Sequence, residues 1–555
     1  MKKNKSLWDY LKQAFLMAKE YFIDSEENYK ASFYLVLAII CVATLVGLSA
    51  ALSWWWVLFW AAFEAKSIAL FLTSLEIFAG ISMAYVAVRA TYRYLVGLIK
   101  LNWRNWFTKK LYHEYIDKNH SFLEIARVSD KLPNPSQRIH QDIDYFVDLS
   151  VDLSLDFLKS ILMLTTFIST LWIIGGSLSL TIMSAHLLIP GYLVWIAITL
   201  AIIATFIKHK IGEPMHKLNN QEADVEAAFR SELETIGPAA ENIALEKGQT
   251  YFKPSLGEKF KAITDNSYEK LKVYTTLAAF DSLYNQLSWI IPYIAAAPIY
   301  FIGSIGLGAL MQIGYSFQEV NSSFSWFMNS FSKLAWYKTN IDRIMDLRTM
   351  IQTPPQTVAI KGIQVNPIEN SHQIIVENLS LHNPHTGKPI AENLTFTFKE
   401  RENVILLGPS GLGKSSIFKV IGGIWPYGQG NISIPNESIY FLSQKPTLPL
   451  HTSLKALMSY PNPVNFYSDP QYEGLLKELG NMEEFIPQLE EVQNWGTKLS
   501  GGQQQKIAFA RAFLLKPKWL FLDESTASLD QLSEIHIYET LLKKLLPDTT
   551  YISIA

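Results

Sequence analysis

Residues 404–415 read Val-Ile-Leu-Leu-Gly-Pro-Ser-Gly-Leu-Gly-Lys-Ser. The apolar residues up to Leu407 predict a strand, and the run Ile417–Ile421 predicts a helix directly after the glycine-rich loop. In such a loop the glycines let main-chain N–H groups wrap phosphates, Lys414 reaches the β- and γ-phosphates, and Ser415 offers a hydroxyl to Mg²⁺. The pattern therefore predicts an ATP site. The expected binding residues are Gly408, Pro409, Ser410, Gly411, Leu412, Gly413, Lys414, Ser415 and Ser416.

A second apolar strand is predicted at Trp519–Leu522, and it ends in Asp523 and Glu524. Taken alone, an acidic pair after a strand is usually the solvated start of a loop. Here the pair follows the phosphate loop in chain order, which favours catalysis. Asp523 would hold Mg²⁺ through water, and Glu524 would polarise the attacking water as a general base.

The segment Leu499-Ser-Gly-Gly-Gln503 precedes a predicted helix rich in small residues. In this segment the sequence resembles the ABC ATPase family, whose signature lies between the phosphate loop and the acidic strand. Gln444 matches the family's Q-loop, and Ala527–Asp530 matches its D-loop. The resemblance implies an α/β P-loop ABC ATPase domain, with Gln444 as a catalytic residue and as a Mg²⁺ ligand beside Ser415 and Asp523.

The signature is also physically suited to bind a γ-phosphate, because its serine and glycines present hydrogen-bond donors at a helix N-terminus. In the family, that phosphate belongs to the nucleotide held by the partner subunit. Since this chain carries one such domain, the resemblance implies a homodimer with a second copy. The signature residues expected to bind nucleotide are Ser500, Gly501, Gly502 and Gln503.

The sequence departs from the family pattern at two places. In the family an aromatic residue before the phosphate loop stacks on adenine, but here that region is Leu379–His385, so a histidine would have to substitute or the stack is missing. In the family a strand such as Thr549–Ala555 leads into a switch histidine on the γ-phosphate, and this sequence stops at Ala555. We therefore expect a clipped or catalytically crippled chain that binds ATP but hydrolyses it poorly.

The bulk composition excludes several other classes of protein. Lys and Arg number 48 against 50 Asp and Glu, so the net charge of -2 gives no support for a nucleic-acid partner. Cys41 is the single cysteine, which excludes a disulfide framework and a cysteine metal site. Charged residues make up 18%, whereas soluble domains carry about 25%. The apolar runs that cause this deficit lie before Pro354 and predict a membrane domain.

Six segments are long and apolar enough for a hydrocarbon core of about 30 Å. The predicted spans are Phe33–Phe59, Ile68–Val88, Leu153–Ile174, Leu187–Ile207, Leu283–Phe301 and Leu307–Trp336. The last one is polar, since it carries Gln312, Gln318, Glu319, Asn321 and Asn329. Polar groups are costly in lipid, so we expect Glu319 to line a hydrated pathway. Interhelical hydrogen bonding is the rival interpretation.

Basic residues gather in two long segments, Leu101–Asp148 and Lys208–Leu277, whereas the other connections are short and nearly uncharged. This bias places both segments and both termini in the cytoplasm. Before the first span, apolar residues recur at helical spacing and predict an amphipathic helix lying at the membrane surface. They are Trp8, Leu11, Phe15, Ala18 and Phe22.

The membrane half resembles the SbmA/BacA-like transporters that are fused to an ATPase. Leu132–Ile139 is similar to their Asn-Pro-Asp-Gln-Arg-Ile loop, and Ala240–Ala244 is similar to their EAA-like loop. Peroxisomal acyl-CoA transporters share both loops. The resemblance implies six transmembrane helices in a type IV exporter-like bundle. Asn134-Pro135 could instead break a helix and Glu241 could be a solvated charge, but their position in the two inward segments favours coupling to the ATPase.

The expected domains are an amphipathic helix and leading segment at 1–30, a transmembrane domain at 31–345, a linker at 346–370 and a nucleotide-binding domain at 371–555. The expected function is ATP-driven transport across a bacterial inner membrane, with uptake of a hydrophilic cargo such as cobalamin or peptides. Export of fatty acids or acyl-CoA is one alternative, and a nucleotide-gated sensor or partner subunit without turnover is another. Membrane lipid and a second copy are the expected partners.

Overall fold

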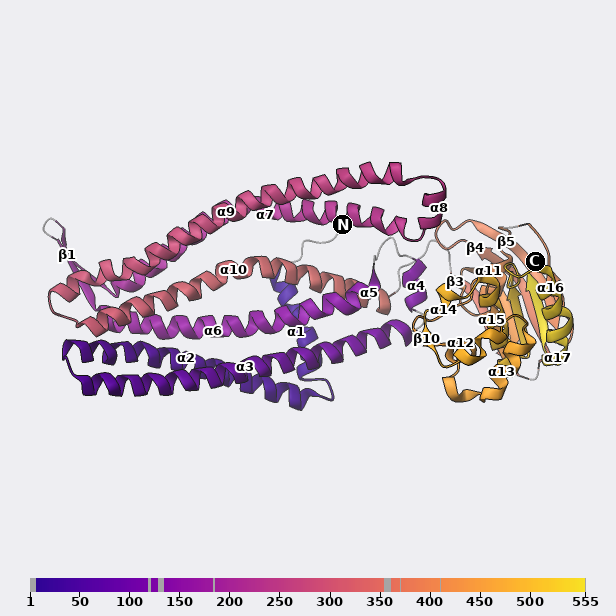
Figure 1. The fold of residues 1–555 in the computed structure, drawn as a ribbon, viewed down its shortest axis with the longest axis horizontal. Coiled ribbons are helices and arrows are strands. Elements are labelled where there is room, and N and C mark those ends of the chain that lie inside the picture. The colour runs from indigo at the N-terminus through magenta and orange to yellow at the C-terminus, as the bar shows by residue number, and fades with distance from the viewer. Residues whose placement is uncertain are drawn as a thin grey trace. The chain divides into compact units, whose positions relative to one another are not determined.

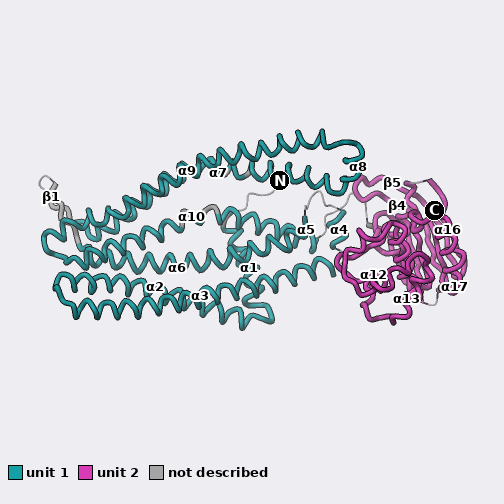
Figure 2. Tube along the Cα trace, in the orientation of Figure 1, with its two compact units in different colours: residues 1–355 teal, residues 356–555 magenta. Residues whose placement is uncertain are grey.

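The apolar segments of the sequence form long helices in a computed structural model of the chain. The structure describes residues 6–117, 121–127, 134–182, 185–353, 361–369, 371–409 and 411–554. Contacts between residues divide the chain into two compact units, Met1–Pro355 and Gln356–Ala555 (Figure 2). The first unit contains the apolar segments, and the second contains the phosphate loop.

The described residues of the first unit form six long helices (Figure 1). They are α2 (Asn28–Glu64), α3 (Ile68–Asp117), α6 (Ile143–Gly175), α7 (Tyr192–Ile236), α9 (Gln249–Phe301) and α10 (Leu307–Gln352). The shorter elements are α1 (Leu7–Phe22), α4 (Ser121–Arg127), α5 (Pro135–Gln137), the π-helix η2 (Arg138–Asp142), β1 (Ser177–Ile182), β2 (Ala185–Pro190) and α8 (Ala240–Leu245). Among the described residues, α2, α3, α7 and the stretch Pro135–Gly175 are long and apolar enough to cross a membrane. The spans within α9 and α10 stay predictions.

The fourth span begins later than the sequence predicts. We expected a helix from Leu187, but Ala185–Pro190 forms β2, which pairs antiparallel with β1, and α7 begins at Tyr192. Gly191, with a φ of 60°, supplies the left-handed turn between strand and helix. The prediction was wrong because a short apolar run has no periodicity that separates a strand from a helix.

The two segments expected as long inward loops are largely helical. α3 continues to Asp117, and α6 begins at Ile143 directly after η2. α7 continues to Ile236, and α9 begins at Gln249. The membrane helices therefore extend well beyond their apolar parts, at about 1.5 Å per residue.

The extensions of α3, α6 and α10 share one buried core with α1. Rings stack across it, with Tyr21 of α1 on Trp103 of α3 at 5.8 Å and Phe146 of α6 on Tyr337 of α10 at 5.7 Å. Below, the extension core means the buried residues Ala14, Met17, Tyr21, Leu95, Ile99, Trp103, Phe107, Leu111, Ile125, Ile143, Phe146, Val147, Val151, Leu155, Tyr337, Ile341, Ile344, Leu347 and Ile351.

Helix α1 has two apolar faces rather than one. The face read from the sequence keeps Trp8 76% exposed and Phe15 64% exposed, as a helix lying on a membrane requires. The adjacent face buries Ala14, Met17 and Tyr21 in the extension core, and Ala18 and Phe22 of the predicted face also pack against it. The amphipathic reading missed this second face because alanine and methionine between charged residues give a weak signal.

Helices α7 and α9 form an antiparallel hairpin that is built differently (Figure 1). Ion pairs keep its register, among them Lys270 with Glu222 at 2.6 Å and Lys208 with Asp281. No described residue between 205 and 283 is buried. Its exposed apolar side chains include Phe206, Leu233, Leu245, Tyr251, Phe260, Tyr268, Leu271 and Tyr274.

The second unit contains two four-stranded sheets. The parallel sheet has the order β6-β12-β11-β8, and the other has the order β3-β7-β4-β5. Their strands are β3 (Lys361–Ile368), β4 (Gln373–His382), β5 (Pro389–Lys399), β6 (Val404–Leu406), β7 (Gly428–Pro435), β8 (Ile439–Leu442), β11 (Trp519–Asp523) and β12 (Thr550–Ile554). The predictions of strands β6 and β11 and of the central strand β12 are confirmed.

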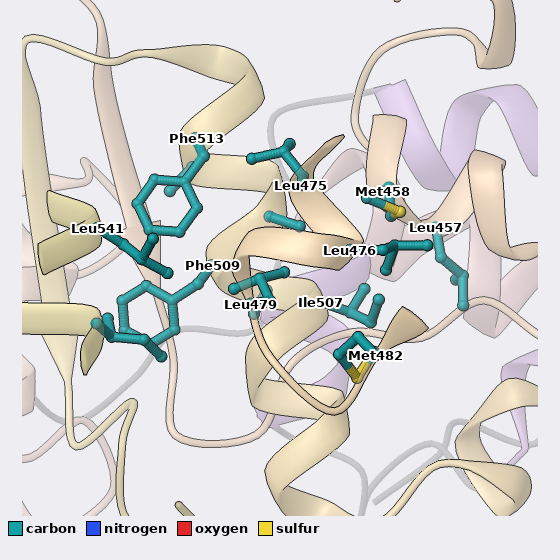
Figure 3. Close-up of a cluster of buried hydrophobic side chains, with 14 of the residues drawn as sticks. Leu457, Met458, Leu475, Leu476, Leu479, Met482, Ile507, Phe509, Phe513 and Leu541 are labelled. Atoms are coloured by element: carbon teal, nitrogen blue, oxygen red, sulfur yellow. The ribbon is translucent and has the colours of Figure 1, made fainter. Parts of the chain in front are cut away.

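Two cores support this unit. One packs α11 (Lys414–Ile421) against the two sheets. The other lies among the helices that surround α15 (Gly501–Leu515), and Figure 3 shows Ile507, Phe509 and Phe513 of α15 pointing into it. The remaining elements are β9 (Thr452–Ser453), α12 (Leu454–Ser459), η3 (Val464–Phe466), α13 (Asp469–Glu478), η4 (Glu483–Gln488), β10 (Val492–Gln493), α14 (Trp495–Lys498), α16 (Gln531–Ile535), η5 (His536–Leu541) and α17 (Leu542–Leu545).

Candidate nucleotide half-site

The phosphate loop joins the end of β6 to the start of α11, as the sequence predicts. Gly411 and Gly413 both have a φ of 87°, a left-handed conformation that turns successive N–H groups toward one side. A side chain at Gly413 would also overlap Ile390. The Lys414 ammonium donates to the Gly408 carbonyl across the loop. Ser410 lies outside the described residues.

Two oxygen-bearing side chains meet beside this loop. The Ser415 hydroxyl, in the first turn of α11, donates to Oδ1 of Asp523 at 2.8 Å. Asp523 is the last residue of β11, which places it at the carboxyl edge of the parallel sheet. A hydroxyl and a carboxylate are ligands that Mg²⁺ accepts. The residues present therefore fit the predicted metal.

Glu524 follows Asp523 in a strained conformation. Its φ of 47° is in the left-handed region, which is uncommon for a non-glycine residue and is often found at functional sites. Nε2 of Gln444 donates to Oε2 of Glu524 at 2.9 Å. Gln444 comes just after β8, and β8 pairs in parallel with β11, so both side chains reach the same edge. The structure thus brings together Lys414, Ser415, Gln444, Asp523 and Glu524.

The signature forms the first turn of α15. Ser500 is the N-cap, and its hydroxyl accepts from the Gln503 N–H at 3.3 Å while Oε1 of Gln503 accepts from the Ser500 N–H at 2.9 Å. This capping box leaves the N–H groups of Gly501 and Gly502 available at the helix N-terminus. A Cβ atom at Gly502 would lie 3.0 Å from the Ser528 carbonyl oxygen, so the signature packs tightly on the D-loop.

The D-loop leads from Glu524 into α16. Asp530 caps that helix, since Oδ1 accepts from the Ser533 N–H at 2.9 Å and Oδ2 accepts from its hydroxyl at 2.7 Å. These bonds hold the pKa of Asp530 below its usual range. The D-loop is therefore anchored at both ends, by the strand and by the cap.

Comparison with known proteins agrees with this geometry. Residues 391–527 match the family model described as ABC transporter, and residues 17–301 match the model described as ABC transporter transmembrane region 2. Over 464 residues the chain is 30% identical to the inner membrane ABC transporter ATP-binding protein YddA of Escherichia coli, covering 83% of this chain and 80% of that protein.

This chain belongs to the ABC transporter family.

Further similarities agree with this assignment. An ABC transporter ATP-binding protein of Haemophilus influenzae is 29% identical over 98% of this chain and 89% of its own length. ABC transporter D family member 2, chloroplastic, of Arabidopsis thaliana is 25% identical over 83% of this chain and 72% of its own length. The solved structure of a bacterial Atm1-family ABC exporter with ATP bound has a TM-score of 0.73 at 15% identity, covering 95% of this chain and 91% of that one. The expected exporter-like fold is confirmed, and hydrolysis of ATP is coupled to transport.

The two inward motifs of this ABC transporter lie in different surroundings. Arg138 and Asp142 of η2 are buried, at 8% and 2% exposure. Nη1 of Arg138 donates to the main-chain carbonyl of Arg343 on α10 at 2.7 Å, and Arg343 lies 3.4 Å from Oδ1 of Asp142. Glu241, by contrast, is exposed on α8. The first motif therefore clamps α10, which sequence reasoning missed because a buried charge and a solvated loop charge look alike in sequence.

Two of the five polar residues in the predicted span of α10 bond to the neighbouring helix α9. Nε2 of Gln318 donates to the Ser288 carbonyl of α9 at 2.9 Å, and Tyr284 of α9 bonds to Asn321. These contacts favour the interhelical interpretation for those two residues. Glu319 is half-buried beside Tyr315, and its exposure to a hydrated pathway stays a prediction. The side chain of Asn329 lies outside the described residues.

The structure also locates the region expected to face adenine. His382 ends β4 and is half-buried, and Asn383 closes the following turn by accepting from the N–H groups of His385 and Thr386. A histidine as the adenine platform stays a prediction.

Proposed function

We propose that this ABC transporter works as a homodimer in a bacterial inner membrane and takes up a hydrophilic cargo such as cobalamin or peptides. Glu319 on α10 supports a polar cargo, because this half-buried carboxylate has no role along the path of an apolar cargo, whereas Gln318 and Asn321 bond to α9. The Escherichia coli relative described as an inner membrane protein supports the location. In this proposal the ATPase unit lies in the cytoplasm, and lipid surrounds the apolar helices.

The proposed domains are those expected from the sequence. A leading segment covers 1–30, the transmembrane domain covers 31–345, a linker covers 346–370 and the nucleotide-binding domain covers 371–555. The boundary between the two compact units, at Pro355, lies inside the proposed linker.

The observation that supports the dimer is the hairpin of α7 and α9. A pair of helices without a core is not stable by itself in water, and the described residues 206–274 of this hairpin and its connection expose eight large apolar side chains. A second copy of the chain is the occupant we propose for this surface. The signature supports the same partner, since its free N–H groups suit a phosphate held by another chain.

The half-site is the part of the nucleotide site that one chain supplies, and each of its residues has a proposed role. Lys414 and the loop N–H groups hold the β- and γ-phosphates, and Ser415, Asp523 and Gln444 hold Mg²⁺. Mg²⁺, when bound, neutralises charge on the phosphate oxygens. Glu524 accepts a proton from water as the water oxygen bonds to the γ-phosphorus and the bond to the β-phosphate oxygen breaks. Gln444 orients Glu524 through the contact at 2.9 Å.

Export of fatty acids or acyl-CoA is a second candidate. It is favoured by the relatives of the D family, such as the Arabidopsis protein, together with the two inward motifs shared with acyl-CoA transporters. The cargo path decides between the candidates, because an acyl chain requires an apolar lining whereas cobalamin or a peptide requires polar groups.

The transport proposal is tested in membrane vesicles of both orientations. Labelled cobalamin, a labelled peptide and labelled palmitoyl-CoA are supplied with ATP on the side of the ATPase unit. We expect cobalamin or the peptide to accumulate in right-side-out vesicles loaded with ATP, and the Lys414→Ala variant to abolish this. Accumulation of palmitoyl-CoA in inverted vesicles given external ATP would contradict uptake and support the second candidate.

The roles at the half-site are tested with two variants. Lys414→Ala should abolish binding of Mg-ATP, because the charge on the phosphates is lost. Glu524→Gln should bind ATP but hydrolyse it about a hundredfold or more slowly, since general base catalysis contributes 10²–10⁴. Hydrolysis by Glu524→Gln at the parental rate would remove Glu524 from the base role.

A further inference from the structure

Gln505 lies on α15, two residues beyond the signature, and only 2% of it is exposed. It begins a run of α15, residues 505–513, in which every residue is buried. Figure 3 shows how Phe509 and Ile507 hold this helix in the core of the unit. The packing therefore fixes the Gln505 side chain.

Both ends of the Gln505 amide are hydrogen-bonded to loops of the half-site. Nε2 donates to the main-chain carbonyl of Gln444 at 3.2 Å. Oε1 accepts from the main-chain N–H of Ser528 at 2.9 Å. One buried side chain thus joins the Q-loop to the D-loop.

Both loops flank Glu524. The Gln444 side chain donates to Oε2 of Glu524 at 2.9 Å, and Ser528 lies four residues after Glu524 in the D-loop. Glu524 itself has the strained φ of 47°, which persists only if the surrounding chain holds it. The two bonds from Gln505 supply such support on both sides.

We infer that Gln505 is a positioning residue for hydrolysis. It connects the signature helix to the Q-loop and the D-loop, and so keeps the Gln444 side chain within hydrogen-bond distance of Glu524. This inference rests on the proposed function in one respect: in a homodimer, the first turn of α15 faces the nucleotide of the partner. Gln505 then transmits the state of that nucleotide to the Glu524 of its own chain. Three glutamines follow one another at 503–505, and only Gln505 of the three is buried.

Two substitutions separate the two bonds. Gln505→Glu keeps an acceptor for the Ser528 N–H but sets a carboxylate against the Gln444 carbonyl, where a donor is required. Gln505→Met keeps the length of the side chain and loses both bonds. The matched control is Gln504→Met, because Nε2 of Gln504 also makes two bonds, to the carbonyls of Gly496 and Leu499, and neither of these residues is in the Q-loop or the D-loop.

The experiment uses the full chain in lipid nanodiscs and measures kcat for ATP hydrolysis, the Kd for Mg-ATP and the thermal midpoint. We expect both Gln505 variants to lower kcat about tenfold or more, as one lost hydrogen bond near the reacting groups can do. The Kd should stay within about twofold, since Lys414 and the loop are untouched. Gln504→Met should lower the thermal midpoint to a similar extent and change kcat less than about threefold.

Equal loss of kcat in Gln505→Met and Gln504→Met would overturn the inference, because the role would then be structural. A parallel rise of the Kd in the Gln505 variants would overturn it as well. The molecular mass of the particles is measured in the same samples. If the wild type is a monomer, the dimer proposal fails, whereas the split between kcat and Kd still tests the positioning role within one chain.

Discussion

The extension of α3 buries Leu95, Ile99, Trp103, Phe107 and Leu111 against α1, α6 and α10. The α7–α9 hairpin, by contrast, buries no described side chain between residues 205 and 283. Both regions continue membrane helices beyond their apolar parts, and both are antiparallel. They differ in whether a third and a fourth helix cover them.

This difference shows which contacts stabilise a long helical extension. The hairpin has well-formed ion pairs, such as Lys270 with Glu222 at 2.6 Å, but pairs of this kind contribute about 0–1 kcal/mol each. They keep the register of two helices without making them stable. The extension core supplies buried apolar area instead, which is the dominant favourable term in folding. One region therefore has its core within the chain, and we propose that the other acquires one from a second copy.

The largest expected effect on stability comes from a substitution in the extension core. Trp103 is 2% exposed and stacks on Tyr21, so Trp103→Ala should lower the free energy of unfolding by about 3–5 kcal/mol. Chemical denaturation in detergent micelles measures this loss. The matched change in the hairpin is Leu271→Ala, which should cost less than about 0.5 kcal/mol in the monomer. Equal costs would remove the distinction between the two regions.

A smaller effect is expected from the clamp between η2 and α10. Arg138→Met removes the bond to the Arg343 carbonyl but keeps the side-chain stem, and should cost about 2 kcal/mol. Transport per ATP hydrolysed should fall with it, because η2 then no longer holds α10. Arg138→Lys, which can still donate, is the control. A variant that loses stability while transporting as much cargo per ATP as the wild type would show that the clamp is only structural.

A substitution in the hairpin should weaken the association of two chains rather than the folding of one chain. Leu271 is 58% exposed, and Leu271→Asp places a charge where we expect contact with a second copy. The dimer should weaken by about 1.5 kcal/mol or more, roughly tenfold in Kd. Mass photometry over a dilution series measures it, with Lys272→Asp, at an exposed charged neighbour, as the control. Unchanged dissociation of Leu271→Asp would place this face outside the interface.

The smallest expected effect concerns the docking of α1 at acidic pH. Burial raises the pKa of the Glu20 carboxyl, but hydrogen bonds from Arg348 and Lys110 outweigh it and hold the pKa below the usual range. A depressed pKa stabilises docking above the unfolded pKa of about 4.3, and this contribution is lost as the pH falls through the folded value. The labelling rate of Met17→Cys in a Cys41→Ala background, divided by the rate of a free thiol at the same pH, should therefore rise as the pH falls below about 4. Adding Glu20→Gln should make this ratio independent of pH in that range.

The half-site was more predictable from the sequence than the first unit was. Lys414, Ser415, Asp523 and Glu524 are carried by short motifs next to strands, and local chain geometry brings each to the same sheet edge. Gln505 was not predicted because its partners are main-chain atoms of distant loops, and nothing in the sequence separates it from Gln503 and Gln504.

In the first unit, six long helices were predictable from apolar length, but their surroundings were not. Nothing in the charge pattern separates the buried Asp142 from the exposed Glu241, since burial depends on which helices pack together. The start of α7 was misplaced because Leu187–Pro190 suits a strand as well as a helix. The lack of a core in the hairpin is likewise a property of packing, and its residues look amphipathic in sequence.

The most direct test of the account is hydrogen–deuterium exchange of the wild-type chain, measured above and below the concentration at which the dimer dissociates. We predict that main-chain amides of the α3 and α10 extensions stay protected at both concentrations, because their core lies within one chain. Amides of residues 205–283 should be protected in the dimer and exchange at least about tenfold faster in the monomer. Protection of the hairpin that does not change with dissociation would contradict the claim that a second copy completes it.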